Sequence, residues 1–264
     1  MTIPPRKPTE VHLAGGDVNE TVLVDGTVRR KTGPWAPAVH ALLRHLEARN
    51  FPSSRLLGID EQGREMLSFI PGSHATDPDP VPPALRTNSG IEQAAELLRR
   101  YHDAVRDFQS DPKLQWRSGA RGLDGQELIC HGDPGPWNTI WNGDRLVGLI
   151  DFDLAEPGSA AFDLGFALWF FAPFRPDAEV ATLFGKGWTG DRMARARLFL
   201  EAYGWNDPRA AIDLVLETQD VEYPRWVARA KAGLEPWVSF VAKGLHKRNR
   251  THHAWLLERR AQFE

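Results

Sequence analysis

Two short acidic segments each follow an apolar run that is typical of a buried strand. The first is His131-Gly132-Asp133, directly after residues 128–130, with Asn138 five residues beyond Asp133. The second is Asp151-Phe152-Asp153, directly after residues 146–150. Carboxylate and amide oxygens are the ligands that Mg²⁺ takes in proteins. A further carboxylate that binds no metal can orient a hydroxyl group and accept its proton.

These parts together are what phosphoryl transfer requires. A metal ion neutralises the phosphate charge, and a carboxylate aligns the attacking hydroxyl with the phosphorus atom. Asp and Asn are also common turn formers after strands, so either segment alone is weak evidence. The occurrence of both segments predicts a phosphoryl-transfer site.

At these residues the chain resembles the aminoglycoside phosphotransferase and choline kinase-like family, which shares the bilobal fold of the protein kinases. The segment 131–138 is similar to the catalytic loop of that family. Residues 150–153, with Asp163 after them, resemble its metal loop. Residues 13–19 are similar to its phosphate-loop turn, and residues 67–72 to its interlobe hinge. The motifs occur in the family's order over roughly residues 11–170.

The resemblance implies a role for each matched position of the two acidic segments. Asp133 would be the catalytic carboxylate that faces the acceptor hydroxyl, and His131 would brace the catalytic loop. Asn138 and Asp151 would hold Mg²⁺. Asp163 would be structural, bonding the backbone of the catalytic loop. The resemblance leaves open whether the remaining carboxylate of the metal loop faces the metal or solvent.

The resemblance also implies a nucleotide, which we expect to be ATP, with GTP as an alternative, bound with Mg²⁺. The expected nucleotide-binding residues come from the phosphate-loop turn, the third strand and the hinge: Gly15, Gly16, Asn19, Arg29, Ser68, Phe69 and Ile70. The two glycines would let the backbone approach phosphates closely, although an ordinary hairpin turn also uses them.

The third strand and the helix after it depart from the kinase pattern. Kinases of this fold pair a Lys on that strand with a Glu on the helix. Here Arg29 falls nearest the Lys position, and its guanidinium fork suits phosphate oxygens. Residues alternate faces along a strand, so Arg30 is expected on the opposite face. No carboxylate lies between Lys31 and Glu47, so the helix Glu is missing, and His40 stands in that region.

The elements that position these residues follow from the hydrophobic pattern. Asp25-Gly26 predicts a two-residue hairpin turn. Apolar residues at helical spacing predict one helix after residue 37 and a long amphipathic helix over about 91–108. The chain is expected to be helical from residue 160 to its end. Strands are expected at 11–13, 20–24, 27–31, 55–60, 65–70, 128–130 and 146–150.

This pattern predicts an α+β, bilobal protein-kinase-like fold. A small antiparallel-sheet lobe with one helix, residues 1–70, would bind the nucleotide. A larger, mostly helical lobe, residues 71–264, would hold the catalytic residues and the acceptor, and its first part, residues 71–90, is a Pro-rich connector.

Composition limits the class of protein. The 264 residues are 42% hydrophobic and 25% charged, which excludes a fully disordered or fibrous chain. The net charge of −3 gives no global basic field, so we expect no nucleic-acid partner. One cysteine, Cys130, excludes an internal disulfide and fits a cytoplasmic location. The apolar stretch 166–173 is too short to span a membrane, and no membrane partner is expected.

The acceptor side is the least determined part of the chain. Asp213, Glu217 and Asp220 lie within about 60° on one helix face. They are candidate acceptor-binding residues that would favour a cationic acceptor, although a charged stripe is more often a solvated face.

The leading functional hypothesis is an ATP-dependent phosphotransferase that phosphorylates a hydroxyl of a small molecule, such as an aminoglycoside-like antibiotic or a related metabolite. The missing helix Glu motivates one alternative, a non-catalytic kinase-like binding or immunity protein. Residues 149–153 also resemble the strand-Asp-x-Asp opening of haloacid-dehalogenase-like phosphatases. In that class the opening comes early in the domain, whereas here a strand-rich lobe precedes it. The sequence does not indicate an oligomeric state.

Overall fold

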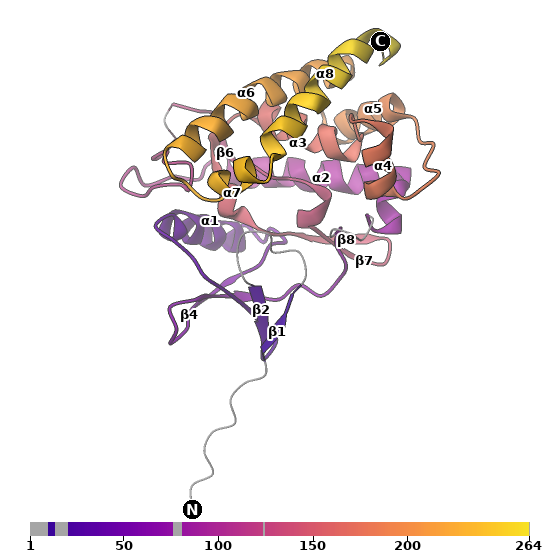
Figure 1. Cartoon of the computed structure of the whole chain (residues 1–264). Coiled ribbons are helices and arrows are strands. Elements are labelled where there is room, and N and C mark those ends of the chain that lie inside the picture. The colour runs from indigo at the N-terminus through magenta and orange to yellow at the C-terminus, as the bar shows by residue number, and fades with distance from the viewer. Residues whose placement is uncertain (1–9, 14–20, 76–80, 124, 264) are drawn as a thin grey trace, which may run out of the picture.

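The computed structural model describes residues 10–13, 21–75, 81–123 and 125–263 (Figure 1). The expected phosphate-loop residues Gly15, Gly16 and Asn19 lie outside the described residues. The chain forms a sheet-rich N-terminal lobe and a helix-rich C-terminal lobe, with helix α1 (Ala36–Ala48) lying between the sheet and the C-terminal helices (Figure 1). This confirms the predicted α+β, kinase-like fold.

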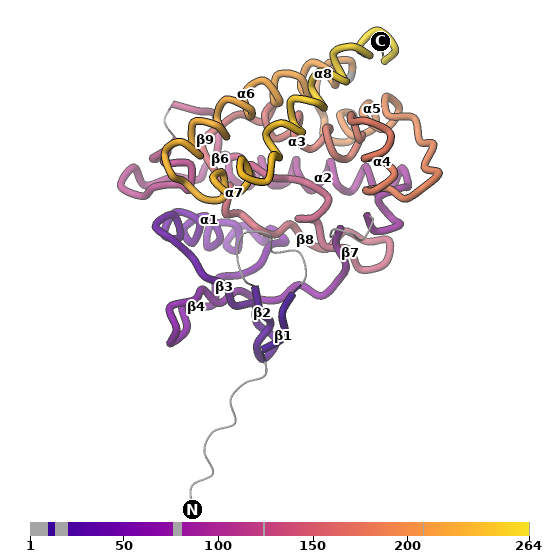
Figure 2. Tube along the Cα trace, in the orientation of Figure 1, coloured from indigo at the N-terminus to yellow at the C-terminus, as the bar shows by residue number. Residues whose placement is uncertain are grey.

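Within the described residues, the N-terminal lobe holds an antiparallel sheet of five strands in the order β1-β2-β3-β5-β4. Figure 2 shows β1 to β4 on the side of α1 that faces away from the C-terminal helices. Asp25 and Gly26 both have positive φ, 47° and 74°, as the two-residue turn between β2 and β3 requires. Helix α1 begins after a Gly-Pro segment and buries its apolar face, including Leu42 and Leu46. It packs against strand β4 of its own lobe and against helix α2 (Asn88–Val105) and residues 152–154 of the C-terminal lobe. The strands are β1 (Glu10–His12), β2 (Thr21–Val24), β3 (Thr27–Arg30), β4 (Leu56–Ile59) and β5 (Glu65–Ser68).

Two short antiparallel strand pairs carry the acidic segments in the C-terminal lobe. Strand β6 (Leu128–Cys130) pairs with β9 (Glu156–Gly158), and β7 (Thr139–Asn142) pairs with β8 (Arg145–Leu149). Strands β6 and β8 were predicted, whereas β7 and β9 were not. The catalytic loop therefore leaves one strand pair and enters the other.

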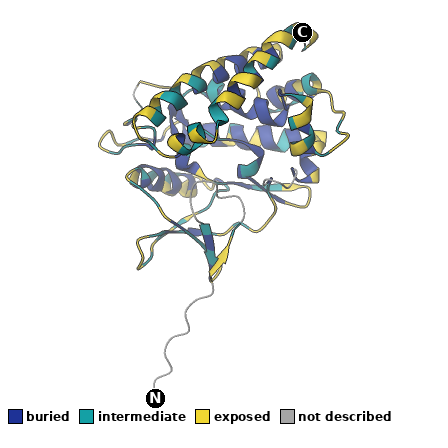
Figure 3. Ribbon diagram, in the orientation of Figure 1, coloured by how far each residue is buried: buried dark blue, intermediate teal, exposed yellow. Residues whose placement is uncertain are grey.

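The remaining elements are helices that surround these strand pairs. Helix α2 (Asn88–Val105) begins at Thr87, whose side chain caps the Gly90 N–H. Helix α3 (Ala160–Phe171) is buried on nearly all sides, and its burial explains why it is apolar all round rather than on one face (Figure 3). The others are α4 (Asp177–Phe184), α5 (Arg192–Tyr203), α6 (Ala211–Lys231), α7 (Trp237–Ala242) and α8 (Leu245–Phe263). Among the described residues, none of these helices has the length and apolar character to cross a membrane.

Helices α3 and α6 approach each other at Gly165. A Cβ atom at Gly165 would lie 2.1 Å from Thr218 Oγ1 and 2.2 Å from the carbonyl oxygen of Leu214. Since a side chain of any size needs more room than this, the absence of a side chain at residue 165 sets the distance between the two helices.

We therefore expect Gly165→Ala to destabilise the protein, although Ala favours a helix. Forcing extra volume into a packed interior typically costs about 1–3 kcal/mol. The free energy of unfolding, measured by urea denaturation, should fall by that amount. Ala228→Ser, at an exposed position of α6, is the control and should leave it nearly unchanged. Equal stability of Gly165→Ala and the parent would show that the helices can separate.

Candidate active site

The catalytic loop is held in place by Asp163, which binds backbone N–H groups of the loop. Asp163, on α3, accepts hydrogen bonds from the N–H groups of His131 at 2.7 Å and Gly132 at 3.0 Å. Gly132 has φ of 81°, and a Cβ there would lie 2.1 Å from the carbonyl oxygen of Leu154. A residue without a side chain is therefore needed between His131 and Asp133, and the buried Asp163 carboxylate fixes the path of the loop.

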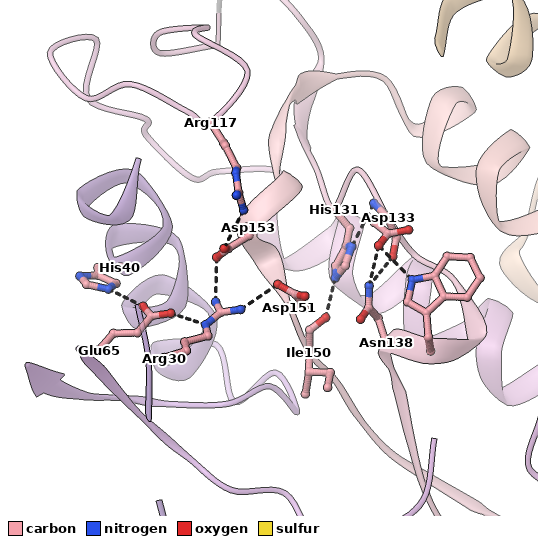
Figure 4. Close-up of polar contacts among 11 residues, drawn as sticks. Arg30, His40, Glu65, Arg117, His131, Asp133, Asn138, Ile150, Asp151 and Asp153 are labelled. Atoms are coloured by element: carbon pink, nitrogen blue, oxygen red, sulfur yellow. Dashed lines mark hydrogen bonds and ion pairs between the residues drawn. The ribbon is translucent and has the colours of Figure 1, made fainter. Parts of the chain in front are cut away.

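His131 joins the catalytic loop to the strand that leads to the metal loop. Its Nε2 donates to the carbonyl oxygen of Ile150 at 3.0 Å, and its Nδ1 accepts the Asp133 N–H at 3.3 Å (Figure 4). Burial lowers the pKa of His131 despite the opposing charge of Asp163, so the ring is neutral. A neutral ring matches this pattern, in which one nitrogen donates and the other accepts.

Asp133 is anchored through one of its carboxylate oxygens. Trp137 Nε1 donates to Oδ2 at 2.9 Å, and Asn138 Nδ2 donates to the same oxygen at 3.1 Å and to the Asp133 carbonyl at 2.8 Å. Burial raises the pKa of Asp133 well above its ordinary value, and the charge of Asp151 adds to this, against the two hydrogen bonds. None of these bonds uses Oδ1, which is the oxygen available to a bound hydroxyl.

Asp151 lies in the turn after β8, with φ of 64°, and its side chain is 46% exposed. Arg30 Nη1 donates to Oδ1 at 2.9 Å. Burial acts to raise the pKa of Asp151, but Arg30 outweighs it and holds the pKa below its ordinary value. The second carboxylate oxygen of Asp151 and the amide oxygen of Asn138 are not used by these bonds. This donor set of hard oxygen atoms fits Mg²⁺.

The structure corrects the expected register of the third strand by one residue. Arg30, not Arg29, points toward the metal loop, and it is only 7% exposed. It donates to Glu65, to Asp151 and, at 2.7 Å, to Asp153 (Figure 4). Because neighbours on a strand face opposite sides, Arg29 is directed away from this cluster. We call Arg30, Glu65, Asp151 and Asp153 the Arg30 cluster.

The partner of Arg30 comes from strand β5 instead of helix α1. Glu65 lies directly opposite Arg30 in the antiparallel register of β3 and β5. Its other carboxylate oxygen accepts a hydrogen bond from His40 Nε2 at 2.8 Å, where His40 stands on α1. Burial acts to raise the pKa of Glu65, yet His40 and Arg30 together keep it below its ordinary value. A strand Glu and a helix His therefore replace the missing helix Glu.

A second arginine, Arg117, joins three separate parts of the chain. Its Nη1 donates to Asp153 at 3.1 Å, and its Nε donates to the carbonyl oxygen of Glu235 at 2.8 Å. The guanidinium also lies over the Trp35 ring, 4.1 Å from the centroid. Asp153 is thus bound by two guanidinium groups, so its carboxylate points toward Arg30 and Arg117.

The expected hinge residues lie at the junction of the lobes. Ser68 ends β5, and its Oγ accepts the Arg55 N–H at 2.8 Å. Ile70 packs close to Gly148 of β8, where a Cβ would lie 2.8 Å from Ile70 Cδ1. Phe69 is exposed. The role of these three residues in binding a nucleotide stays a prediction.

The acidic stripe on α6 is paired with α8. Asp213 lies 2.8 Å from Arg260, and Asp220 lies 3.1 Å from His253, while Glu217 is exposed. At 100° per residue, the opposite face of α6 carries Glu222. Two of the three expected residues therefore pair with α8, and the face of α6 that influences Asp133 is a different one.

Glu222 is the acidic residue of α6 nearest to the catalytic chemistry. It is buried, it accepts a hydrogen bond from Trp226 Nε1, and its charge acts on Asp133. Burial raises its pKa to about 7, against the opposing charge of Arg225. Arg225 also binds Glu156 of β9, so two buried carboxylates share this arginine.

Comparisons with known proteins show the family of this chain. Residues 109–199 match the model of the phosphotransferase enzyme family. The trifolitoxin immunity protein of Rhizobium leguminosarum bv. trifolii is 38% identical over 200 residues, which are 74% of each protein.

Solved structures with the same fold are more distant in sequence. A choline/ethanolamine kinase family protein from Mesorhizobium loti has a TM-score of 0.57 at 14% identity, covering 97% of this chain and 95% of its own. The ethanolamine kinase of Plasmodium vivax has a TM-score of 0.56 at 13% identity, covering 99% and 83%. The GDP complex of aminoglycoside 2'-phosphotransferase-IIIa has a TM-score of 0.54 at 14% identity, covering 94% and 95%. This kinase-like fold leaves the phosphatase alternative without support.

The raised pKa of Glu222 makes a prediction about stability. Folding favours the protonated form of Glu222. Its stabilising contribution to the free energy of unfolding is therefore fully present below about pH 4.5 and is lost as the pH rises through about 7. Gln imitates the protonated form. We expect Glu222→Gln to be more stable than the parent at pH 8, by on the order of 3 kcal/mol, and equally stable at pH 4.

Urea denaturation at the two pH values measures this difference. Glu217→Gln, at an exposed site on the same helix, is the control, and its free energy of unfolding should stay close to that of the parent at both pH values. A gain at pH 4 as large as that at pH 8 would contradict the assignment.

Proposed function

Because this chain belongs to the phosphotransferase enzyme family, we propose that it transfers the γ-phosphoryl group of ATP to a hydroxyl group of a small molecule. The observation that carries this proposal is the joint placement of Asp133 and Asp151. His131 bonds both the Asp133 N–H and the carbonyl oxygen before Asp151, so the two acidic loops are held in one arrangement.

The chemistry of the acceptor falls to Asp133. Its free Oδ1 accepts a hydrogen bond from the acceptor hydroxyl and takes the proton as the phosphoryl group moves across. Because the transition state is loose, alignment of the hydroxyl matters more than early removal of its proton. Trp137 and Asn138 fix Oδ2, which keeps the carboxylate from rotating.

The chemistry of the nucleotide falls to Asn138, Asp151 and Arg30. Asn138 and Asp151 would hold Mg²⁺, which neutralises charge on the phosphates when it is bound. Arg30 orients Asp151 through the bond to Oδ1. It is also the arginine of β3 that faces the metal loop, so we assign to it the phosphate contact first expected of Arg29.

The acceptor belongs to a class of hydroxylated small molecules. Structural neighbours include aminoglycoside phosphotransferases and ethanolamine kinases, which supports an antibiotic or a related metabolite. We propose that the acceptor site lies between the catalytic loop and helices α3 and α6, because the charge of Glu222 on α6 acts on Asp133 and Asp163 on α3 holds the catalytic loop.

The similarity to an immunity protein favours a second candidate, a binding protein that acts without phosphorylation. The intact set Asp133, Asn138 and Asp151 favours catalysis, and Glu65 supplies the carboxylate that α1 lacks. A thermal-shift measurement with Mg·ATP separates the candidates: the kinase should be stabilised by Mg·ATP, and ADP release should follow when an acceptor is added.

Asp133→Asn keeps the shape of the side chain and removes its charge. We expect kcat to fall by about 10²–10⁴, the usual scale for a general base. The affinity for Mg·ATP, measured by isothermal titration calorimetry, should change little, because Asp133 binds no metal. Asp144→Asn, at the exposed turn between β7 and β8, is the control and should keep full activity. Collapse of Mg·ATP affinity in Asp133→Asn would place this residue in the metal site instead.

The two arginines of β3 offer a matched pair. We expect Arg30→Met to raise the KM for ATP by at least about 10-fold, because it removes a hydrogen bond to a charged group and also the bond that orients Asp151. Arg29→Met should leave the KM for ATP nearly unchanged, because Arg29 faces away from the Arg30 cluster. Initial rates at varied ATP measure both, and Arg30→Lys tests whether a positive charge alone suffices. A larger effect for Arg29 than for Arg30 would contradict the observed register.

A further inference from the structure

Two deeply buried polar side chains of the C-terminal lobe make no hydrogen bonds within the described part of the chain. Arg175, in the loop between α3 and α4, is 6% exposed, and its Nε and Nη2 have no partner. Gln219, on α6, is 2% exposed, and neither atom of its amide group has a partner. Buried polar groups are nearly always paired, so each of these calls for a partner that the chain does not supply.

The charge of Arg175 is poorly compensated by its neighbours. Glu179 is the acid that acts on it most, but the carboxylate of Glu179 is bound to His252 Nε2 at 2.8 Å. Arg248 acts in the opposite sense. Burial together with Arg248 outweighs Glu179 and lowers the pKa of Arg175 to about 9. A buried cation held in this way costs free energy unless an anion joins it.

Arg175 is connected to the catalytic carboxylate by a row of two aromatic rings, Trp137 and Phe170. The guanidinium lies 4.1 Å from the Phe170 centroid. The rings of Phe170 and Trp137 meet edge to face with centroids 4.5 Å apart. Trp137 then donates its N–H to Asp133. A hydroxyl-binding carboxylate thus stands at one end of this aromatic row, and an unpaired guanidinium stands at the other.

We propose that the acceptor carries a carboxylate group that Arg175 binds while its hydroxyl group lies at Asp133. A carboxylate accepts two parallel hydrogen bonds from one edge of a guanidinium. The two nitrogens of Arg175 without a partner, Nε and Nη2, form such an edge. The part of the acceptor between the two groups lies along the aromatic row. Gln219 lies about 60° from Glu222 on the same helix, and the Glu222 charge acts on Asp133. The unpaired amide group of Gln219 therefore offers two N–H donors and one acceptor oxygen to a polar group of the same molecule.

This inference rests on the proposed function and narrows it. It replaces the cationic acceptor expected from the α6 stripe by an anionic one. The stripe residues Asp213 and Asp220 are paired with α8, whereas Arg175 has no paired anion. The unsatisfied charge on the acceptor side is therefore positive.

Matched acids and amides test the inference directly. The probes are N-acetylserine, glycerate and gluconate, each compared with its own amide, and binding to the full chain is measured by isothermal titration calorimetry with Mg·ADP present. At least one acid should bind about 10-fold more tightly than its amide, as expected for a charged bidentate hydrogen bond. Arg175→Met should abolish that preference. Arg209→Met, whose side chain is 90% exposed, should keep it.

The stability of Arg175→Met is a second readout that does not require a ligand. Because this change removes an unpaired buried charge, we expect the melting temperature of the free protein to rise or stay equal. A variant that has lost the preference for acids while being at least as stable cannot be explained by misfolding. Should Arg175→Met melt well below the parent, Arg175→Lys provides the binding comparison, since it keeps the charge and loses the fork.

Three results would overturn the inference: equal affinity of the parent for every acid and its amide, a preference for acids that survives in Arg175→Met, or phosphorylation of a cationic acceptor that Arg175→Met does not affect. In the last case the kinase proposal stands. Conversely, an acid that binds through Arg175 but yields no ADP release in the presence of ATP supports the carboxylate site and counts against phosphotransfer by this protein.

Discussion

The buried charge of Arg30 is the constraint on which the junction of the lobes depends. One guanidinium from the N-terminal sheet is bonded to a carboxylate of its own sheet and to two carboxylates of the metal loop. Breaking a buried pair by removing one partner typically costs about 3–5 kcal/mol, because the other charge is left unpaired. The Arg30 cluster therefore sets where the metal loop lies relative to the sheet.

The catalytic loop depends on the same metal loop through His131 and on α3 through Asp163. Asp163 also accepts a hydrogen bond from His102 Nε2 at 3.1 Å, and the other nitrogen of His102 bonds the Tyr203 hydroxyl at 2.7 Å. Helices α2, α3 and α5 thus meet at one carboxylate beneath the catalytic loop. Backbone bonds from both sides therefore determine the position of Asp133, and the bonds of Trp137 and Asn138 to its carboxylate then fix the orientation of the side chain.

The sequence was sufficient where function depends on residues close together in the chain. The acidic segments, the Asp25-Gly26 turn and the long helix predicted over about 91–108, which is α2 (Asn88–Val105), are local patterns, and they predicted the kinase-like fold. Contacts between distant residues were not accessible in the same way. Arg30 rather than Arg29 faces the metal loop because it pairs with Glu65 across β3 and β5. Predicting that pair would have required the register between two separate hairpins. Nothing in the segment around Arg117 marked it as a partner of Asp153. The α6 stripe was visible, but its pairing with α8 was not.

The close contact of α3 and α6 at Gly165 limits how this protein can change over evolution. Helix α3 carries Asp163, which holds the catalytic loop, and α6 carries Glu222, whose charge acts on Asp133. Because the two helices are in contact at Gly165, α6 cannot shift to enlarge the proposed acceptor site without losing its packing. A change of acceptor during evolution must therefore come from side-chain substitutions, while the distance between the backbones of α3 and α6 stays the same. Residue 165 must remain small throughout.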